Sequence, residues 1–548
     1  MLKMGKHSIR NLLKIRKMKR IVITVALGLL CISLQAQTAN YEWLKSLSGS
    51  NDDFARGVCM DSLSNIYVTG SFSGTTTIGG QTLTSNGATD IFIAKFASNG
   101  NLVWAKSFGS VSLDYAFDID CVTGGNFFIT GGFRQTMTLQ PNTTITSTGG
   151  LDLFTAKFNT NGDCLWAKTA TGTASEYGNE IVATTNGNVA VIGNTQGTMI
   201  IESDTLTHLD STDLFVVKYD ANGNKIWSKG LPGIGNAGGR AISSDDFENT
   251  YIAGAFEGNI LIDTVVFNST TVPNNDIFIS KFSPNGTLIW AKQFGGIGND
   301  YARGIDIDAS GNIYVSGVFS NSIDFDGLIL TVVGSSDIFL IKMDSNGNII
   351  WGKKIGDNGA EEGCEIEVNE NEEVFITGGF SQSITLGLTT FNSIGFRDVF
   401  IAKLDSSGNF IWAKTAGSIQ DDVNYAIGLN RINEDLCTVG TYSGTFTDGI
   451  HSITSIGGVD SYISKIQSTN SLGINNITSG DRILIVYPNP ANTFINVDCK
   501  KGYQIYSSIG QLVKQSSQAT TQITISDLPT GVYILKTEEQ VVRFIKTE

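Results

Sequence analysis

Tryptophan recurs along this chain at a nearly constant interval, and this interval constrains the fold more than any other feature of the sequence. Successive tryptophans stand about 61 residues apart, and a lysine follows each of them two positions later. The tryptophans are Trp43, Trp104, Trp166, Trp227, Trp290, Trp351 and Trp412. A fixed period of this length indicates one supersecondary unit repeated many times, in a stack or around an axis.

Each repeat has the pattern of four short β-strands. In the fifth repeat, residues 301–308 and 313–317 read as strands around a tight turn. Residues 337–343 and 349–353 follow as a second pair of strands after a variable stretch. The turn of this second pair contains Asn-Gly in most repeats, and these two residues tolerate the positive φ that short hairpins require.

Two further positions recur in every repeat. An Asp-x-aromatic-x-x-Lys motif begins the third strand, at Asp90, Asp152, Asp213, Asp276, Asp337, Asp398 and Asp460. Glycine ends the second strand, at Gly70, Gly131, Gly193, Gly254, Gly317, Gly378 and Gly440. Four strands per repeat, apolar on both faces, are typical of a β-propeller blade.

The two ends of the repeat region are complementary. Asp460 begins a seventh third strand without a tryptophan after it, whereas Trp43 stands near the start without a third strand before it. We therefore predict that the strand of Trp43 completes the last repeat, which would remove exposed sheet edges. The alternative, a linear solenoid, gives no reason for complementary ends. The predicted fold is all-β: a seven-bladed β-propeller over residues 37–467, closed by the N-terminal strand, followed by a small Ig-like β-sandwich.

These motifs also resemble a known family. The period, the strand Gly-Asn-Ile-Tyr-Val-x-Gly at 311–317 and the hairpin Asp-Ile-Phe-x-x-Lys at 337–342 are similar to the SBBP-type β-propeller repeats of secreted bacterial proteins. The resemblance covers residues 41 to about 467. It implies a propeller with an extracellular role and no specific ligand.

The N-terminal segment predicts export. Residues 1–20 contain eight lysines and arginines and no acid, and residues 21–34 are mostly apolar before Gln35-Ala36-Gln37. This is the pattern of a secretory signal peptide, which we place at residues 1–36. The apolar run is short for a membrane span, and no other stretch approaches the roughly 20 apolar residues that a spanning helix needs. We therefore expect no transmembrane segment.

Charge and cysteine content restrict the partners and the chemistry. The formal net charge is −15 and becomes more negative once the basic leader is removed. We expect no nucleic-acid partner, because phosphate binding needs clustered lysine and arginine. The cysteines after the leader are Cys59, Cys121, Cys164, Cys364, Cys437 and Cys499. They stand at different offsets from the tryptophans, without a disulfide framework or metal spacing, and we interpret them as small buried thiols.

The C-terminal segment carries a different set of motifs. After a polar linker at 468–481, residues 482–548 alternate apolar and polar residues in six or seven short strands, as in a small β-sandwich. The motif residues are Tyr487, Pro488, Asn489, Pro490, Gly510, Leu528, Pro529, Gly531, Tyr533 and Lys546. In this order they resemble the type A C-terminal sorting domain of the type IX secretion system of Bacteroidetes. The resemblance implies recognition by the secretion machinery, removal of the domain, and a protein that is secreted or attached to the outer cell surface. An ordinary Ig-like adhesion module is the alternative.

The candidate reactive groups are carboxylates. His208 and His451 lie in variable stretches of different repeats, so we expect no histidine pair for catalysis or zinc. An acid stands ten residues after six tryptophans, at Asp53, Asp114, Glu176, Asp300, Glu361 and Asp422, while Ala237 breaks the series. These acids could ring one mouth of a central channel and bind a cation such as calcium. The alternative is that they cap turns or pair with lysines. Sixfold recurrence speaks against catalysis, which needs a few differentiated groups.

The sequence therefore predicts a non-enzymatic protein, without a catalytic residue or a firm cofactor, that binds an extracellular glycan or protein. The variable stretches between the second and third strands are the expected binding elements, because loops on a rigid scaffold commonly carry binding. A carboxylate-dependent glycan hydrolase or lyase is the alternative, since a glycosidase needs only two suitably spaced acids. A structural surface-layer or gliding role is a third possibility. The repeat lysines are expected to lie along aromatic rings and pair with acids.

Overall fold

The computed structural model describes residues 38–469 except 123, 141, 142 and 210, and residues 491–547 except 500, 501, 508–511 and 538–540. The chain divides into two compact bodies, Met1–Ser471 and Leu472–Glu548, here called the repeat body and the C-terminal body. In the described residues of both bodies the regular structure is β-strand, with no helix. The predicted signal peptide, residues 1–36, lies outside the described residues.

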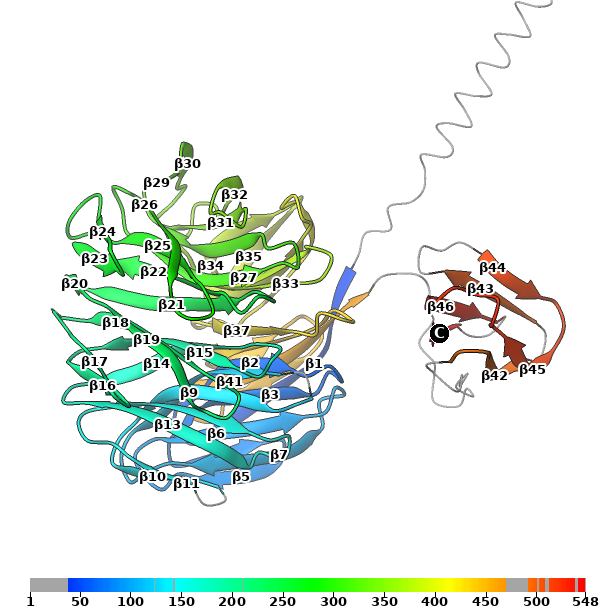
Figure 1. Ribbon diagram of the computed structural model, residues 1–548, viewed down its shortest axis with the longest axis horizontal. Coiled ribbons are helices and arrows are strands. Elements are labelled where there is room, and N and C mark those ends of the chain that lie inside the picture. Colours follow the sequence, from blue (N-terminus) through cyan, green and yellow to red (C-terminus); the bar gives the residue numbers. More distant parts are fainter. Residues whose placement is uncertain are drawn as a thin grey trace, which may run out of the picture. The chain divides into compact units, whose positions relative to one another are not determined.

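The repeat body consists of antiparallel four-stranded units that follow one another along the chain (Figure 1). In order from the first to the fourth strand, the first three are β2 (Asp53–Met60), β3 (Ile66–Phe72), β6 (Asp90–Phe96), β7 (Leu102–Phe108); β8 (Asp114–Cys121), β9 (Phe127–Phe133), β12 (Asp152–Phe158), β13 (Cys164–Gly172); and β14 (Glu176–Ala183), β15 (Val189–Thr195), β18 (Asp213–Tyr219), β19 (Lys225–Leu231). The next three are β21 (Ala237–Ser244), β22 (Thr250–Phe256), β25 (Asp276–Phe282), β26 (Leu288–Gly296); β27 (Asp300–Ile307), β28 (Ile313–Phe319), β31 (Asp337–Met343), β32 (Ile349–Ile355); and β33 (Glu361–Val368), β34 (Val374–Leu386), β35 (Thr389–Leu404), β36 (Phe410–Ala416). The last unit is β37 (Val423–Leu429), β38 (Asp435–Tyr442), β41 (Asp460–Thr469) and β1 (Thr38–Gly49).

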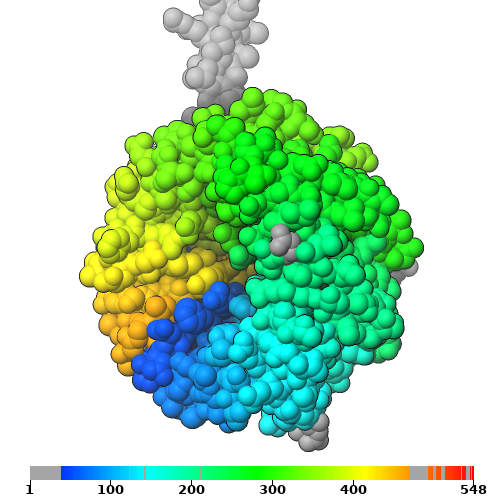
Figure 2. All heavy atoms as spheres, turned by 90° about the vertical axis from the view of Figure 1, so that its left-hand side faces the viewer, coloured from blue at the N-terminus to red at the C-terminus, as the bar shows by residue number. Residues whose placement is uncertain are grey.

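The fourth strand of the last unit comes from the other end of the repeat region. β1 pairs antiparallel with β41, so that Trp43 lies opposite Lys465. In Figure 2 the N-terminal residues of the repeat body, in blue, lie directly beside its last residues, in orange. The prediction that the strand of Trp43 completes the last repeat is confirmed. β41 ends at Thr469, slightly later than the sequence prediction of 467, because the pairing with β1 continues to Thr38.

The first strands of the units form the centre of the repeat body. Each first strand contacts the first strands of the two neighbouring units, in the order β2, β8, β14, β21, β27, β33, β37, and β37 contacts β2 again. In the described residues no single sheet closes on itself, so this succession is held by side-chain packing between separate sheets. One edge of each first strand is free of ladder pairing and faces its neighbours or the centre.

The variable stretches form small hairpins. They are β4 (Thr75–Ile78) with β5 (Gln81–Thr84), β10 (Thr136–Leu139) with β11 (Thr143–Thr146), β16 (Met199–Ile201) with β17 (Asp204–Leu206), β23 (Asn259–Ile262) with β24 (Val265–Asn268), β29 (Ser322–Phe325) with β30 (Leu328–Thr331), and β39 (Thr445–Thr447) with β40 (Ser452–Thr454). The short strand β20 (Gly233–Ile234) pairs with β23, and in the sixth unit the hairpin continues from β34 and β35. Side chains such as Ile78, Leu139 and Ile262 bury one face of these hairpins, so the stretches are partly scaffold rather than open loops.

The constant tryptophan interval has a structural cause. The indole nitrogen of Trp104 donates a hydrogen bond to the carbonyl of Thr160, in the hairpin turn of the next unit, at 3.2 Å. The equivalent bonds join Trp43 to Ser98, Trp166 to Ala221, Trp227 to Pro284, Trp290 to Ser345 and Trp351 to Ser406. The turn glycine, Gly162 here, has φ +72°, and a Cβ there would lie 2.9 Å from the Trp104 ring. Each tryptophan therefore packs its unit onto the turn of the next.

Trp412 is the exception, and it marks the position of the seam. The turn that it would contact is replaced by the two ends of the repeat region, and its buried Nε1 finds no acceptor among the described residues. The repeat lysines behave as predicted: Lys106 lies 5.7 Å from the centroid of the Trp104 ring and 2.9 Å from the Asp163 carboxylate.

The C-terminal body contains two sheets in its described residues. One pairs β42 (Phe494–Cys499) with β45 (Thr520–Thr524), and the other has the order β44 (Leu512–Ser516), β43 (Tyr503–Ser507), β46 (Gly531–Lys536), β47 (Val541–Lys546). Ile495 and Ile523 from the first sheet share one apolar core with Ile505 and Leu535 from the second. The two sheets therefore pack face to face, as in a small sandwich.

Candidate functional site

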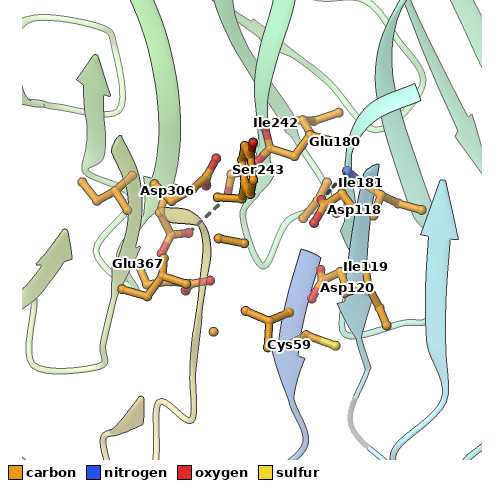
Figure 3. A pocket seen from close by; sticks show the side chains of 18 of the residues that line it. Cys59, Asp118, Ile119, Asp120, Glu180, Ile181, Ile242, Ser243, Asp306 and Glu367 are labelled. Carbon is orange, nitrogen blue, oxygen red and sulfur yellow. Dashed lines mark hydrogen bonds between the residues drawn. The ribbon is translucent and has the colours of Figure 1, made fainter. Parts of the chain in front are cut away.

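A cavity of about 1120 Å³ lies among the first strands of all the units of the repeat body. In Figure 2 the face of the repeat body that is turned to the viewer is hollowed near its centre. Figure 3 shows some of the side chains that line the cavity. The cavity is of the size that small-molecule and oligosaccharide sites commonly have. Its walls are made by residues that differ from one repeat to the next.

A β-bulge in each first strand aims one residue at this cavity. In β2 the pairing with β3 shifts between Ala55 and Gly57, so that Arg56 has no ladder partner. The bulged residues in the seven first strands are Arg56, Phe117, Asn179, Arg240, Arg303, the pair Gly363 and Cys364, and Tyr425. A bulge turns a side chain away from the ladder and is a common device beside functional sites. The backbone thus repeats while the presented side chain changes.

Three of these bulged residues are arginines, and they lack ion-pair partners. Five arginines line the cavity, and two of them, Arg397 and Arg431, make ion pairs with acids. Arg56, Arg240 and Arg303 make no ion pair with any described residue. Burial lowers the pKa of Arg240, and the charges of Arg303 and Arg56 lower it further. The three guanidinium groups therefore repel one another across one cavity.

Aromatic rings stand beside these arginines. The Arg56 guanidinium lies 4.6 Å from the Tyr425 ring centroid and 5.7 Å from that of Phe117. Tyr115 and Tyr177 also line the cavity. Cation–π contacts hold the Arg56 side chain without neutralising its charge.

Carboxyl groups occupy the next positions along the first strands. The Asp118 carboxylate accepts a hydrogen bond from the backbone N–H of Ile181, in the neighbouring first strand, at 2.9 Å (Figure 3). Asp120 accepts one from Ala183 at 2.7 Å in the same way. These acids thereby satisfy the free edge of the neighbouring strand, which would otherwise bury unpaired N–H groups.

Crowding and burial keep several of these carboxyls protonated to unusually high pH. Burial raises the pKa of Asp118 to about 8, although the N–H of Ile181 opposes the shift. Burial raises the pKa of Glu180 well above its usual range, with the charges of Glu365 and Asp118 adding to the effect. Burial also raises the pKa of Glu365 well above its usual value. The cavity thus combines protonated carboxyl groups with cationic arginines.

An ion-pair cluster spans three units on another part of the wall. Arg431, just after β37, donates to Asp306 of β27 at 2.7 Å and to Glu367 of β33 at 3.1 Å. Ser243 donates to the same Asp306 carboxylate (Figure 3). The backbone N–H of Val368 also donates to it. The Asp306 charge holds the pKa of Arg431 above its usual value. Arg431 thus reaches past the neighbouring sixth unit to Asp306 in the fifth.

The six predicted rim acids are those that stand ten residues after a tryptophan. The first five begin first strands and the last directly precedes β37, and all six side chains are buried: Asp53, Asp114, Glu176, Asp300, Glu361 and Asp422. Each faces the aspartate that begins the third strand of the preceding unit, as Asp300 faces Asp276. Alternation along the strand turns these side chains toward the neighbouring sheet, although Asp422 also lines the central cavity.

The buried acid pairs have unusual protonation. Burial and the neighbouring carboxylate raise the pKa of Asp300 to about 8 and that of Glu361 to about 9. Burial raises the pKa of Asp53 and Asp422 to about 7. Part of the capping alternative holds: Asp114 accepts backbone hydrogen bonds from Ser110 and Arg134. Among the described residues no group of three histidine, cysteine or acidic side chains is placed to hold a metal ion.

One cysteine prediction is also wrong. Cys59 of β2 and Cys121 of β8 form a disulfide across a Cα–Cα distance of 5.8 Å, and Cys59 lies at the cavity wall (Figure 3). Their offsets from the repeat tryptophans differ, but adjacent first strands bring them together, a proximity that spacing cannot reveal. Cys164 and Cys437 are buried free thiols, as predicted. The side chains of Cys364 and Cys499 lie outside the described residues.

The sequence analysis missed the residues of the cavity because it followed the recurring positions. The signal lies in the residues three, four and six positions after each first-strand acid, which vary strongly between repeats. The scaffold positions of the repeat are nearly constant, whereas the bulged position holds Arg56, Phe117 or Arg240 in different repeats. Such variation indicates side chains that the fold itself does not require.

Comparisons with known proteins agree with the architecture. Residues 289–327 match the Beta-propeller repeat family, and residues 485–547 match the Secretion system C-terminal sorting domain. The chain therefore carries β-propeller repeats and a type IX sorting domain. This domain implies recognition by the secretion machinery and export to the cell surface or extracellular space. No helix within the described part of the chain is long and apolar enough to cross a membrane.

Individual relatives are distant. An uncharacterized WD repeat-containing protein of Acanthamoeba polyphaga mimivirus is 25% identical over 389 residues, 63% of this chain, and the match spans only 25% of that protein. The WD40 domain of Neurospora crassa Pan2 is similar with 9% identity and a TM-score of 0.38, over 80% of this chain and 98% of that one. A protein of unknown function from Dyadobacter fermentans has 9% identity and a TM-score of 0.36, over 79% and 99% of the two chains.

In the sorting domain, the described motif residues lie together. Leu528 and Tyr533 are buried, and the Tyr533 hydroxyl donates to the carbonyl of Pro529 at 2.8 Å. Gly531 begins β46 and Lys546 ends β47, and these two residues pair across the ladder. The motif residues Tyr487, Pro488, Asn489, Pro490 and Gly510 lie outside the described residues.

Proposed function

We propose that the repeat body is a closed seven-bladed β-propeller that binds an extracellular ligand in its central cavity without transforming it. The observation that carries the proposal is the set of bulged residues. Seven first strands share one backbone irregularity, and at this position the side chain differs between units while the scaffold positions recur. A constant scaffold whose side chains differ where they meet around one cavity is suited to binding a specific ligand.

We further propose the domain boundaries 1–36 for a signal peptide, 37–467 for the propeller, 468–481 for a linker and 482–548 for the sorting domain. We also propose that the sorting domain is Ig-like. The hydrogen bond from Tyr533 to the carbonyl of Pro529 supports this, because Ig-like sandwiches often hold a corner with a tyrosine bonded to upstream backbone.

The test uses the full chain on a glycan array, together with a matched pair of substitutions. Phe117→Ala removes a ring from the cavity wall, and Phe396→Ala removes an exposed ring from a variable stretch. If the cavity is the binding site, Phe117→Ala weakens binding at least about tenfold and Phe396→Ala leaves it unchanged, since an aromatic contact contributes on the order of 1 kcal/mol or more. The reverse result would place binding on the variable stretches and refute the proposal.

A second candidate is a carboxylate-dependent glycan hydrolase or lyase. The raised pKa of Glu180 and of Asp118 favours it, because a general acid must hold its proton at neutral pH. A polysaccharide turnover assay separates the two proposals. Turnover by the full chain that Glu180→Gln abolishes, with Phe396→Ala as the control, would establish the enzyme and exclude the binding-only function.

A further inference from the structure

The three unpaired arginines narrow the chemistry of the ligand, on the assumption that the cavity is the binding site proposed above. Arg56, Arg240 and Arg303 come from the first, fourth and fifth units, so they approach the cavity from different sides. Because each of them is the bulged residue of its first strand, the three arginines lie at equivalent positions along these strands. A single ligand in the cavity can therefore meet more than one guanidinium.

The remaining charges of the wall do not neutralise these arginines. The acids Asp306 and Glu367 are already engaged by Arg431, and Asp118 and Asp120 are engaged by backbone N–H groups. Glu362 pairs with Arg397, and Ser418 donates to Asp422. Glu365 is the acid that Arg303 attracts, but burial and the charges of Asp118 and Glu367 raise its pKa. The Nε of Arg303 is buried and finds no acceptor among the described residues. The Arg240 side chain is exposed and those of Arg56 and Arg303 are half-buried, so all three can meet a bound anion without first breaking an ion pair.

The geometry points to an acidic saccharide, bearing carboxylate or sulfate groups, as the ligand of the central cavity. Guanidinium groups bind planar oxyanions through two parallel hydrogen bonds, which a neutral sugar cannot accept as well. The rings of Phe117, Tyr177 and Tyr425 offer flat apolar surfaces for sugar rings. The partly exposed carboxyl groups of Glu180 and Glu365 offer hydrogen bonds to hydroxyls.

Nucleic acid does not fit the same surface. The chain has a formal net charge of −15, and the arginines without ion pairs on this wall are three residues around one cavity rather than a basic stripe. Strong phosphate-backbone binding needs many such contacts along a path. A short acidic saccharide needs only a few.

Calorimetric titration of the full chain with three tetrasaccharide probes tests the inference. Tetragalacturonate carries carboxylates, a chondroitin sulfate tetrasaccharide also carries sulfates, and cellotetraose is neutral. We expect binding of at least one acidic probe, little or no binding of cellotetraose, and weaker binding at higher salt. The preferred acidic probe tells carboxylate from sulfate recognition.

Substitutions assign the effect to the arginines. Arg240→Gln should lower the affinity for the acidic probe at least about tenfold, because a charge-assisted bidentate hydrogen bond is lost. Arg240→Lys should lower this affinity less, because the positive charge remains. Lys292→Gln is the matched control: it removes one positive charge at an ion pair with Asp326 on the outer part of the repeat body. Thermal unfolding of each variant verifies that the fold is intact.

The outcomes separate this inference from the proposed function. Equal binding of neutral and acidic probes, or no effect of Arg240→Gln, overturns the acidic ligand, while a neutral ligand lost on Phe117→Ala would still support the cavity as the binding site. Absence of binding by all three probes overturns the inference. If Lys292→Gln lowers the affinity for the acidic probe as much as Arg240→Gln does, the net charge of the protein explains the binding. This result would also overturn the inference.

Discussion

The buried acid pair Asp276–Asp300 makes a quantitative prediction about stability and pH. The Asp276 carboxylate accepts hydrogen bonds from the backbone N–H of Thr270 at 2.8 Å and from Gln293 at 2.7 Å. The Asp300 carboxyl is buried near the backbone of Gly296 and Ser320, whose hydrogen bonding lowers its pKa less than burial raises it. Burial and the Asp276 charge raise the pKa of Asp300 from 3.8 to about 8. At neutral pH Asp300 is therefore protonated in the folded chain and ionised in the unfolded chain.

The sign and size follow from proton linkage. Between the unfolded and folded pKa values the folded state holds one extra proton, so the stability that this proton provides is complete below about pH 4 and is lost as the pH rises toward about 8. Within this window one such acid lowers the free energy of unfolding by about 1.4 kcal/mol per pH unit. From about pH 5.5 to about pH 7.5 the loss is about 3 kcal/mol.

Asp300→Asn tests this directly, because the amide can donate to Asp276 at every pH. We expect the variant to have nearly the wild-type stability at about pH 5.5 and to be more stable than the wild type by about 3 kcal/mol at about pH 7.5. The assay is guanidinium unfolding followed by tryptophan fluorescence, with a chelator present so that no cation replaces the proton. Asp344→Asn is the control, since Asp344 is a partly exposed turn residue with a lowered pKa, and Asn159 fills the equivalent turn position in another repeat. If the free energy of unfolding of Asp300→Asn depends on pH as strongly as that of the wild type, protonation of Asp300 is not the cause of the pH dependence.

Three further predictions address the seam, the disulfide and the ion-pair cluster. Trp43→Ala should cost about 3–5 kcal/mol and reduce amide protection in β38 and β41, more than 390 residues away in sequence; loss confined to β1 and β2 would contradict the seam. Cys59→Ser should cost about 2–4 kcal/mol under oxidising conditions, and a reductant should lower the melting temperature of the wild type but not that of the variant. Arg431→Met should cost about 1–2 kcal/mol above about pH 8 and less below it, because burial raises the pKa of Glu367 to about 8; an equal cost on both sides of this pH in urea unfolding would argue against the charge cluster.

The strand architecture followed from the sequence because it is written in local, repeated signals. Asn-Gly turns, glycine at the end of the second strand and Asp-x-aromatic starts each act within a few residues, and their period is insensitive to the rest of the chain. The pairing of β1 with β41 was also predictable, because a missing strand at one end and a spare strand at the other leave few alternatives.

The cavity was much less accessible to sequence reasoning. Which face of a first strand meets the neighbouring unit and which meets the centre depends on a β-bulge, and a bulge reverses the alternation after it. The bulges lie after Asp53 and Asp300 and set the direction of Arg56 and Arg303, so the sequence pattern does not identify these two arginines as cavity residues.

The sequence by itself determined the repeat, the four strands of each unit, the complementary ends and the sorting motifs, because each of these depends on local propensity or on counting. The tertiary structure decided which residues meet across units: the acid pairs, the Cys59–Cys121 disulfide, the cluster around Arg431 and the three arginines of the cavity. These contacts join residues of different units, and their geometry is set by the packing of neighbouring sheets. A periodic sequence specifies the unit, whereas the placement of units around a common centre specifies what their side chains can bind.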